Sequence, residues 1–426
     1  MGSIMWGAVL FCLAGVEAPA SQLDQAARIK ALEDTVRALQ TEVADLRAAR
    51  AGGVSSDQVA AMVRAEIAKS GYNDVMAKMP GWLDGIRFYG DLRLRYEGLW
   101  YGERNDVQQE SQQHMRIRAR FGFEKKFGDE WEIGFRLASG SNDDPTSTNQ
   151  SLTNDFNKKL VWIDLAYAKY SPAWLKGFTI GGGKFLNPFM STDMVWDTNV
   201  NQEGLYETYK TKVCGSLEAF ATVGQLFLKD NATGPDAELL AYQGGLRYAF
   251  APNVTLTGAV AYYDYIQVEQ AGNFGTCGAR GNTVKGARLA SDDFNLLDCL
   301  VELKFPVLGV PVALTGDFVQ NLGDSVTGPA AGRDKGYAGF IKVGETKKVG
   351  DWSVLYKYAY VEADAVLGVF ADNTSGPADR KGHKVEVAYQ VHKNVVLSVA
   401  GYWTMPVDTS GMAPRQTLQA DVIFKF

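Results

Sequence analysis

The chain has 426 residues, of which 46% are hydrophobic and 22% charged, and its formal net charge is −6. This charge argues against a nucleic-acid-binding protein, because proteins that bind phosphate backbones need a basic surplus. The length would allow about two or three globular domains, but the composition does not change after about residue 84, which favours one large unit. No apolar run is long enough for a membrane-spanning helix.

The first residues have the pattern of a targeting segment. The apolar run from Ile4 to Val16 is followed by Ala18-Pro19-Ala20. A short apolar region before an Ala-x-Ala site predicts a secretory signal peptide over residues 1–20, cleaved after Ala20 and taking Cys12 with it. The residues before the run include no Lys or Arg, so a buried structural helix is the alternative interpretation.

The next stretch, residues 21–80, carries helical signals. Apolar side chains fill the two seam positions of three successive heptads, at Ile29, Leu32, Val36, Leu39, Val43 and Leu46. This repeat predicts a short coiled coil, and a single amphipathic helix lying on another surface is the alternative. Ala51-Gly52-Gly53 interrupts the run, Ser55 and Gln58 form a capping box for a second helix, and Pro80 ends the helical region.

From Gly85 onward the hydrophobic period changes to two residues, which is the period of a strand. In the first segment the apolar side chains stand at even numbers, at Ile86, Phe88, Leu92, Leu94 and Tyr96. The charged side chains stand at the odd numbers between them, at Arg87, Asp91, Arg93, Arg95 and Glu97. One face of such a strand is apolar and the other is charged.

Sixteen segments of the chain share this period. They cover residues 86–97, 113–125, 131–140, 159–171, 177–186, 199–213, 216–228, 238–250, 253–268, 292–305, 311–322, 335–346, 352–364, 381–391, 395–404 and 415–426. The links between them alternate strictly between long and short, with 141–157, 271–291 and 367–380 among the long ones and 171–175, 251–253, 306–310 and 392–394 among the short ones.

This sorting of the links decides the fold class. A soluble antiparallel sheet packs its apolar face on a core and has no reason to gather long loops at one end. An outer-membrane barrel has short periplasmic turns, longer extracellular loops and an even number of strands. We therefore expect a 16-stranded antiparallel transmembrane β-barrel over residues 85–426, apolar outside and wet inside, with the helical segment in the periplasm.

The positions of aromatic residues support the predicted barrel. Several adjoin the short links, where a girdle at the membrane boundary is expected: Trp131, Trp174, Phe250, Phe305 and Trp352. The last segment keeps the alternation and ends on Phe426. A terminal strand of this kind is typical of the signal recognised by the outer-membrane assembly machinery, and a chance last residue is the alternative.

The charged face of the first three strands predicts a cationic wall in the lumen. It carries seven arginines, Arg87, Arg93, Arg95, Arg116, Arg118, Arg120 and Arg136, whose guanidinium groups stay protonated in proteins. Compensating carboxylates are expected from Asp91, Glu97 and Glu132, or from Asp193 and Asp197 in the link between the fifth and sixth strands. The alternative is that the arginines only solvate a polar wall.

Cysteines and metal ligands give weaker signals. Cys214 falls at a short turn, Cys277 in a long loop and Cys299 in mid-strand. A disulfide needs Cα atoms within roughly 7 Å, so we expect no disulfide. Cys277–Cys299 is the one pair worth testing. Asp143 and Asp144 could bind a hard cation such as Ca²⁺, but a solvated turn is the favoured interpretation. We expect no cofactor and no metal.

Several motifs resemble a known family. They are Gly90-Asp91-Leu92-Arg93-Leu94-Arg95-Tyr96, Arg116-Ile117-Arg118-Ala119-Arg120, Asn142 to Gln150, Gly183-Lys184-Phe185-Leu186-Asn187-Pro188-Phe189, and Trp196-Asp197 with Glu203-Gly204. The sequence is similar over essentially the mature chain to the bacterial outer-membrane family labelled putative porins, whose members carry a short N-terminal coiled coil. This resemblance implies a passive channel. In sixteen-stranded trimeric porins the third loop folds inward, so the link with Asp193 and Asp197 is the expected constriction.

The leading interpretation is therefore a diffusion channel for hydrophilic solutes in the outer membrane, surrounded by lipids and assembled as a homotrimer. A tether is the second interpretation, in which the periplasmic helix contacts the cell wall. An enzyme is the third. The sequence has only His114, His383 and His392, and no nucleophile is evidently paired with any of them, so we expect no catalysis.

Overall fold

The computed structural model describes residues 37, 41, 83, 85–102, 110–153, 155–268, 279–285, 288–290, 294–323, 332–375, 377–408 and 413–426. The predicted signal peptide lies outside these residues. Of the predicted coiled coil only Arg37 and Thr41 are described, and both are helical. The Thr41 hydroxyl donates to the Arg37 carbonyl at 3.0 Å, as side chains one turn apart can. The coiled coil itself stays a prediction.

Residues Gly85–Phe426 form one compact unit built on sixteen long strands. These are β1 (Ile86–Tyr101), β2 (Gln112–Phe127), β3 (Trp131–Ser139), β5 (Val161–Tyr170), β6 (Phe178–Leu186), β7 (Asn201–Cys214), β8 (Leu217–Lys229), β9 (Ala237–Ala251), β10 (Val254–Ile266), β13 (Phe294–Val307), β14 (Val310–Asn321), β15 (Lys335–Gly344), β16 (Trp352–Val361), β17 (Arg380–His392), β18 (Val395–Pro406) and β19 (Arg415–Lys425). Three two-residue strands, β4 (Gln150–Ser151), β11 (Val284–Lys285) and β12 (Arg288–Leu289), lie in the long loops.

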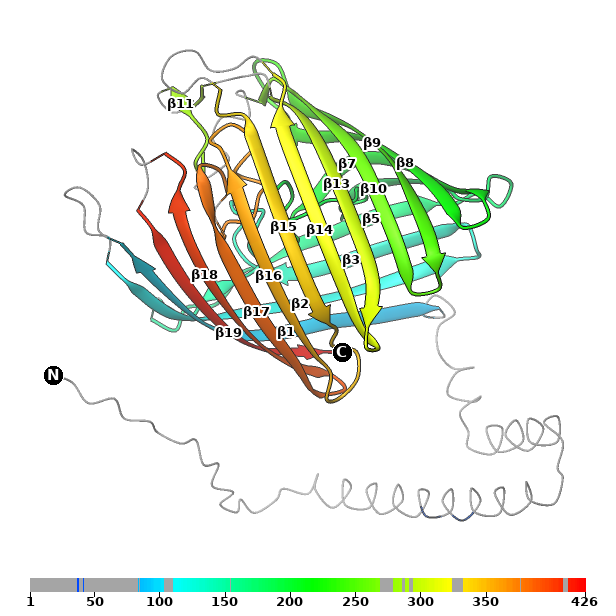
Figure 1. Cartoon of the computed structure of the whole chain (residues 1–426), viewed down its shortest axis with the longest axis horizontal. Helices are drawn as coiled ribbons and strands as arrows, with labels where there is room; N and C mark the ends of the chain where they lie inside the picture. Colours follow the sequence, from blue (N-terminus) through cyan, green and yellow to red (C-terminus); the bar gives the residue numbers. More distant parts are fainter. Residues whose placement is uncertain are drawn as a thin grey trace. The chain divides into compact units, whose positions relative to one another are not determined.

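The sheet closes on itself. Each long strand pairs antiparallel with the next, and β1 pairs with β19 from Asp91↔Lys425 to Tyr101↔Arg415. Figure 1 shows the strands running round the unit side by side. The predicted 16-stranded antiparallel barrel is confirmed, and its predicted segments overlap the observed strands one for one. Among the described residues, no helix is long and apolar enough to cross a membrane.

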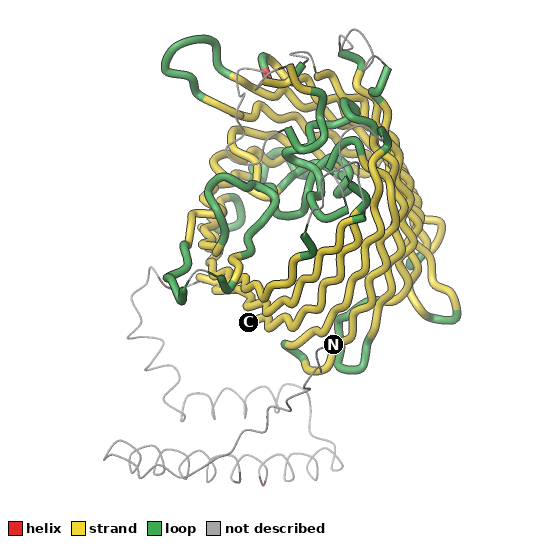
Figure 2. The backbone as a smooth tube through the Cα atoms, turned by 90° about the vertical axis from the view of Figure 1, so that its left-hand side faces the viewer, coloured by secondary structure: helices red, strands yellow, loops and turns green. Residues whose placement is uncertain are grey.

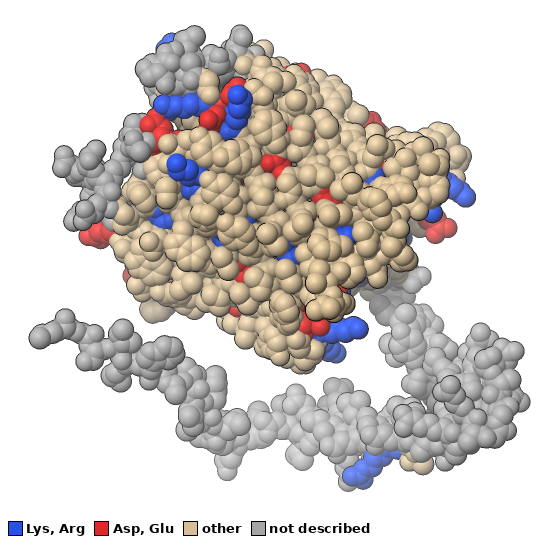
Figure 3. Space-filling model, viewed as in Figure 1, with Lys and Arg blue, Asp and Glu red and all other residues tan. Residues whose placement is uncertain are grey.

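The outer surface of the barrel is largely apolar. In β1, Leu92 and Leu94 are exposed, whereas Arg93 between them is almost fully buried in the lumen. The same alternation repeats in β17 and β18, where Val387 and Val399 face outward. Figure 3 shows a broad uncharged face whose larger charged groups lie toward its ends. This pattern suits lipid outside and water inside.

The short turns carry the predicted aromatic girdle. Trp131, Trp174, Phe250 and Trp352 are all exposed next to short turns, and the Trp131 ring stacks on Tyr170 with ring centroids 4.4 Å apart. Aromatic side chains at this level are typical of the membrane–water interface.

Several long loops turn into the lumen instead of away from it (Figure 2). We name the described residues of the segments 140–160, 187–200, 267–293 and 362–379 loops L2, L3, L5 and L7; for L5 these are residues 267–268, 279–285 and 288–290. Trp196 of L3 stacks on Phe370 of L7 at 5.3 Å between ring centroids and packs edge-on against Tyr263 of β10. A continuous buried apolar cluster joins L3, L5 and L7 to inward-facing residues of β5 to β10 and β13 to β16. On this side the inner wall is largely apolar, because loops and not water cover it.

Hydrogen bonds fix L3 in place. The amide of Asp197 donates to the carbonyl of Phe370 at 2.7 Å, and the amide of Asp372 donates to the carbonyl of Asp193 at 2.9 Å. Gln243 of β9 exchanges two hydrogen bonds with the backbone of Met190, at 2.8 and 2.7 Å. L3 is thus held both to L7 and to the barrel wall.

Gly204 of β7 has a backbone conformation that L-residues rarely adopt. Its φ is +142°, and a Cβ added there would lie 2.1 Å from the carbonyl oxygen of Gln225 on β8. Such a contact cannot relax without breaking the β7–β8 ladder, because the obstacle is backbone. By contrast, a Cβ at Gly244 would meet nothing within 4 Å.

We predict that Gly204→Ala destabilises the barrel by about 2 kcal/mol or more, through this clash and the strained φ. Urea unfolding of the protein in lipid vesicles measures the change, with Gly244→Ala as the matched control. Equal unfolding midpoints for the two variants would contradict this account of Gly204.

Candidate functional site in the barrel lumen

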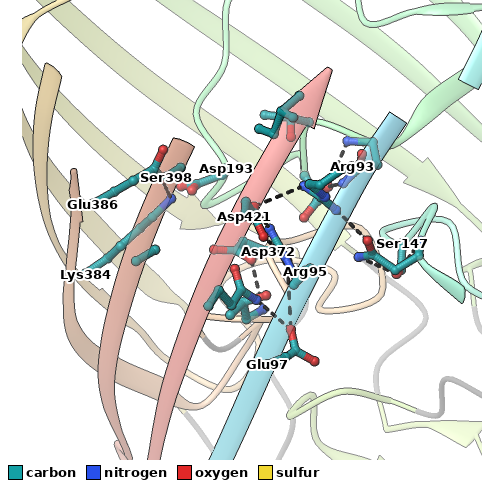
Figure 4. A pocket seen from close by; sticks show the side chains of 18 of the residues that line it. Arg93, Arg95, Glu97, Ser147, Asp193, Asp372, Lys384, Glu386, Ser398 and Asp421 are labelled. Atoms are coloured by element: carbon teal, nitrogen blue, oxygen red, sulfur yellow. Dashed lines mark hydrogen bonds and ion pairs between the residues drawn. The ribbon is translucent and has the colours of Figure 1, made fainter. Parts of the chain in front are cut away.

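A polar cavity of about 430 Å³ lies between the inward loops and the wall formed by β17, β18, β19, β1 and β2. The wall contributes Arg93, Arg95 and Glu97 of β1, Arg116 of β2, Lys384 and Glu386 of β17 and Asp421 of β19. The loops contribute Asp144 and Asn149 of L2, Asp193 and Asp197 of L3 and Asp372 of L7. Figure 4 shows several of these side chains, among them Arg93, Asp372 and Lys384, reaching into the cavity from different elements.

Arginines of β1 and β2 are held by carboxylates of the neighbouring strands. Arg95 binds Asp421 with two hydrogen bonds of 2.7 Å across the closing seam of the barrel. Arg116 donates to Glu97 at 2.8 Å. Arg93 donates to the side-chain oxygen of Asn149 in L2 at 2.5 Å, and its nearest carboxylate is Asp421 at 3.9 Å.

The other arginines line a second cavity of about 510 Å³, which also contacts Tyr89 and Arg93. Arg118 and Arg120 share Asp91, at 2.7 and 2.6 Å. Arg136, beside them, binds Asp164 of β5 at 2.5 Å. The side chains of Arg118 and Arg136 are largely buried, so these charges form part of the packed wall.

Six lumenal arginines therefore face four carboxylates, Asp91, Glu97, Asp164 and Asp421, which leaves two positive charges in excess. Asp91 and Glu97 take the compensating role predicted for them. Glu132 does not, because it binds Lys169 at 3.0 Å and accepts from the Tyr167 hydroxyl at 3.2 Å.

Arg87 lies apart from the other arginines. It is near the start of β1, its side chain is 70% exposed, and it binds Glu124 at 2.6 Å. It lines neither of the two arginine cavities. Period two places it on the lumenal face, but its position at the short-turn end keeps it away from the inward loops.

The carboxylates of L3 contact lysine and amide groups, not the arginines. Asp193 accepts from the Nζ of Lys357 at 2.5 Å, and Lys357 is almost completely buried between Asp193 and Asp372, whose Oδ2 is 3.7 Å away. Asp197 accepts from the backbone and side-chain amides of Asn199, both at 2.8 Å. Both aspartates still line the same cavity as Arg93, Arg95 and Arg116.

The carboxyls of Asp197 in L3 and Asp372 in L7 have opposite pKa shifts. Burial raises the pKa of Asp197 to about 7, and the negative charge of Asp372 adds to this effect. Burial alone would also raise the pKa of Asp372, but the positive charges of Lys357 and Lys384 outweigh it and hold that pKa below its usual range. The cavity therefore contains one carboxyl that changes its charge near neutral pH.

L2 and L5 close the site from the long-loop side. Arg280 of L5 binds Asp144 at 2.9 Å and donates to the Thr146 hydroxyl at 2.7 Å. Asp144 also accepts from the backbone of Thr146 at 3.0 Å, as in an Asx turn. No cluster of ligands suited to a metal ion occurs among the described residues.

The histidines and cysteines lie in separate places. His114 contacts Glu97 at 2.9 Å inside the lumen, while His383 accepts or donates a 2.9 Å bond with the Tyr356 hydroxyl on the outer face. Cys214 and Cys299 are free thiols. Cys277, and with it the proposed pair with Cys299, lies outside the described residues.

Comparisons with known proteins agree with this architecture. The model of one protein family, described as "Putative porin", matches residues 13–111, 106–287 and 276–426. No curated protein sequence matches the chain. Two solved structures have similar folds. Salmonella typhi OmpF in complex with daunomycin shares 12% identity, covering 82% of this chain and 100% of its own, with a TM-score of 0.50. Pseudomonas putida OprB at high pH shares 12% identity, covering 80% and 94%, with a TM-score of 0.54.

At these identities the two structures show the fold alone, whereas the family model spans almost the whole chain. The closed sheet, its apolar outer wall and its charged lumen are what a membrane channel needs. The chain therefore belongs to the putative porin family and is a channel barrel of the bacterial outer membrane.

Proposed function

We propose that small hydrophilic solutes and ions diffuse passively through this barrel, and that L3 narrows their path against the arginine wall. The observation that carries the proposal is the shared cavity, which Asp193 and Asp197 of L3 line together with Arg93, Arg95 and Arg116. A barrel of sixteen strands is wide enough to leave an aqueous channel.

The attachment of L3 supports its role as a fixed constriction. The Thr192 hydroxyl donates to Asp317 of β14, and Lys357 of β16 binds Asp193 at 2.5 Å. These partners lie on β14 and β16, six and four strands from β1 round the barrel. L3 also buries Phe189 and Trp196 in the apolar cluster. A loop held at so many points keeps a constant aperture.

The distribution of charge gives the constriction its proposed selectivity. Excess guanidinium groups lie on β1 and β2, and carboxylates of L2, L3 and L7 lie across the cavity. Opposite charges on two sides of a narrow pore set a field across it, and rings or patches of charge select among ions. Small solutes with a negative or dipolar group would align in this field.

A catalytic role is not part of the proposal. His114 contacts Glu97 and lies on the same strand as Arg116, and a nucleophile–base pair needs a hydroxyl or thiol within reach.

We also propose that the barrel assembles as a homotrimer surrounded by outer-membrane lipids. Contact with the assembly machinery through Phe426 and with the cell wall through the helical segment stay predictions.

We predict that Arg116→Ala and Arg118→Ala each shift ion selectivity toward cations, because each removes one positive charge from the lumen. A unit charge about 7 Å from an ion in water changes the ion's energy by about 0.6 kcal/mol, with opposite signs for a cation and an anion. The permeability of each ion should therefore change about threefold in opposite directions, and their ratio roughly sevenfold. Reversal potentials across a planar bilayer with a salt gradient measure this ratio. Arg87→Ala is the control and should leave it unchanged. If both lumenal variants behave like the control, the arginines only solvate the wall.

We predict that selectivity depends on pH near neutrality, because Asp197 has a pKa of about 7. Below that pH its carboxyl is neutral, and above it the cavity gains one negative charge. Cation permeability relative to anion permeability should therefore rise between pH 6 and pH 8, by up to the same roughly sevenfold factor. Asp197→Asn should abolish the rise. A wild-type ratio that is flat over this range, or a rise that persists in Asp197→Asn, would refute the assignment.

A further inference from the structure

The second cavity, of about 510 Å³, extends from Arg93 toward the short-turn ends of β1 and β19. Five of its lining side chains are cationic: Arg93, Arg118, Arg120, Arg136 and Lys425. We propose that the second cavity is a binding site for a small organic acid, that is, a carboxylate carried on an apolar or aromatic body. This inference deepens the proposed function and rests on it for the route by which such a solute enters.

Strand register sets two of these arginines against each other. In the β1–β2 ladder Arg93 lies directly opposite Arg118, and Arg95 lies opposite Arg116. Like charges that face each other across an antiparallel pair destabilise it. The Arg95–Arg116 pair has Glu97 at 3.8 and 2.8 Å from its two guanidinium groups. No carboxylate of the described residues contacts both Arg93 and Arg118, so an anion bound there would relieve their repulsion.

Arg93 is poorly satisfied although it is only 9% exposed. Its Nη2 donates to Asn149 at 2.5 Å, and its Nε is buried without a hydrogen-bond partner. Its Nη1 lies 3.9 Å from Asp421, but Arg95 already holds that carboxylate with two bonds of 2.7 Å. A buried donor without an acceptor costs free energy, and a bound carboxylate can supply the acceptor.

The charge of the second cavity is unbalanced as well. Arg118 and Arg120 share Asp91 at 2.7 and 2.6 Å, and the arginine of β3 binds Asp164 at 2.5 Å. Lys425, opposite Asp91 in the β1–β19 ladder, has no ion-pair partner among the described residues. Five cations thus meet two carboxylates, which leaves three positive charges. Guanidinium forks match the two oxygens of a carboxylate.

The rest of the lining favours an organic anion over an inorganic one. Tyr89 lies opposite Gly122 in the β1–β2 ladder, and a Cβ at Gly122 would be 3.0 Å from the ring carbon Cζ of Tyr89. The glycine therefore leaves room for the ring against the wall. Ile423 lies opposite Arg93 in the β1–β19 ladder, where a wet wall would carry a polar side chain. An apolar body can cover Tyr89 and Ile423 while its carboxylate meets the arginines.

The second cavity adjoins the site at L3. Arg93, Ile423 and Lys425 line both cavities. Arg93 can therefore hold a carboxylate as it passes from one cavity to the other. Permeation of such acids should saturate once the second cavity is filled.

The first test compares three ligands on the full-length wild-type protein by isothermal titration calorimetry in detergent. Benzoate carries both the charge and the apolar body, benzamide has the body without the charge, and sulfate has charge without the body. We expect benzoate to bind at one site per chain, at least tenfold more tightly than either of the others. Absence of saturable benzoate binding, or equal affinity for benzamide or sulfate, would overturn the proposal. This test needs no variant and so does not depend on the folding of one.

The second test places the ligand. Arg93→Gln and Arg120→Gln should each weaken benzoate binding at least tenfold, because each removes a guanidinium group that the carboxylate would contact. Tyr89→Ser should weaken benzoate binding and leave sulfate binding unchanged. Arg87→Gln, on the same strand but outside both cavities, is the matched control and should keep the wild-type affinity. If Arg93→Gln and Arg120→Gln bind benzoate as the control does, the site lies elsewhere and the proposal fails.

Conductance separates this proposal from the channel itself. In a planar bilayer, benzoate should reduce the chloride conductance of the wild-type protein saturably, with a midpoint at its dissociation constant, and benzamide should not. If the protein conducts but benzoate neither binds nor blocks, the binding site is refuted and the passive channel stands. If benzoate binds in detergent and no conductance appears, the binding site stands and the passive channel is refuted.

Discussion

The structure depends on the absence of water in the hydrocarbon of a membrane. A strand edge left open there would expose unsatisfied amides and carbonyls, each at a cost of several kcal/mol, so a sheet can span the membrane only if it closes. The pairing of β1 with β19 provides this closure. Closure then fixes everything else, because it gives each strand one face toward lipid and one toward an enclosed space.

The enclosed space is divided into two unlike halves. On β9, β10 and β13 to β16 the inner face is largely apolar and is covered by L3 and L7, to which a few buried polar side chains such as Asp317 and Lys357 are bound. On β1, β2 and β19 it is charged and remains open to the cavity. L3 is attached to strands of the first half, through Gln243, Asp317 and Lys357, so it does not cover the second. We therefore infer that the path for solutes runs along the side where Arg93, Arg95 and Arg116 meet the loop carboxylates.

Much of this architecture could be predicted from the sequence, because alternation and loop length are local signals. The alternation of Leu92 with Arg93, for example, predicts a strand with one apolar and one charged face from the local sequence alone. The apolar inner wall also has a sequence signal that the analysis of alternation does not use. From Ala259 to Tyr263 both faces of β10 are apolar, as expected where loops cover the lumenal side of a strand. The partners Asp164 and Asp421 were not assigned, because register between distant strands is not visible in local periodicity. The same holds for Asp372, whose position depends on how L7 packs against L3.

The central claim is that the closed barrel contains a continuous water-filled path past L3. Single-channel recording of the purified wild-type protein in a planar bilayer tests it most directly. The account predicts discrete, steady conductance steps that grow with salt concentration. A protein that inserts into the bilayer as a folded barrel and yet gives no steps would contradict it.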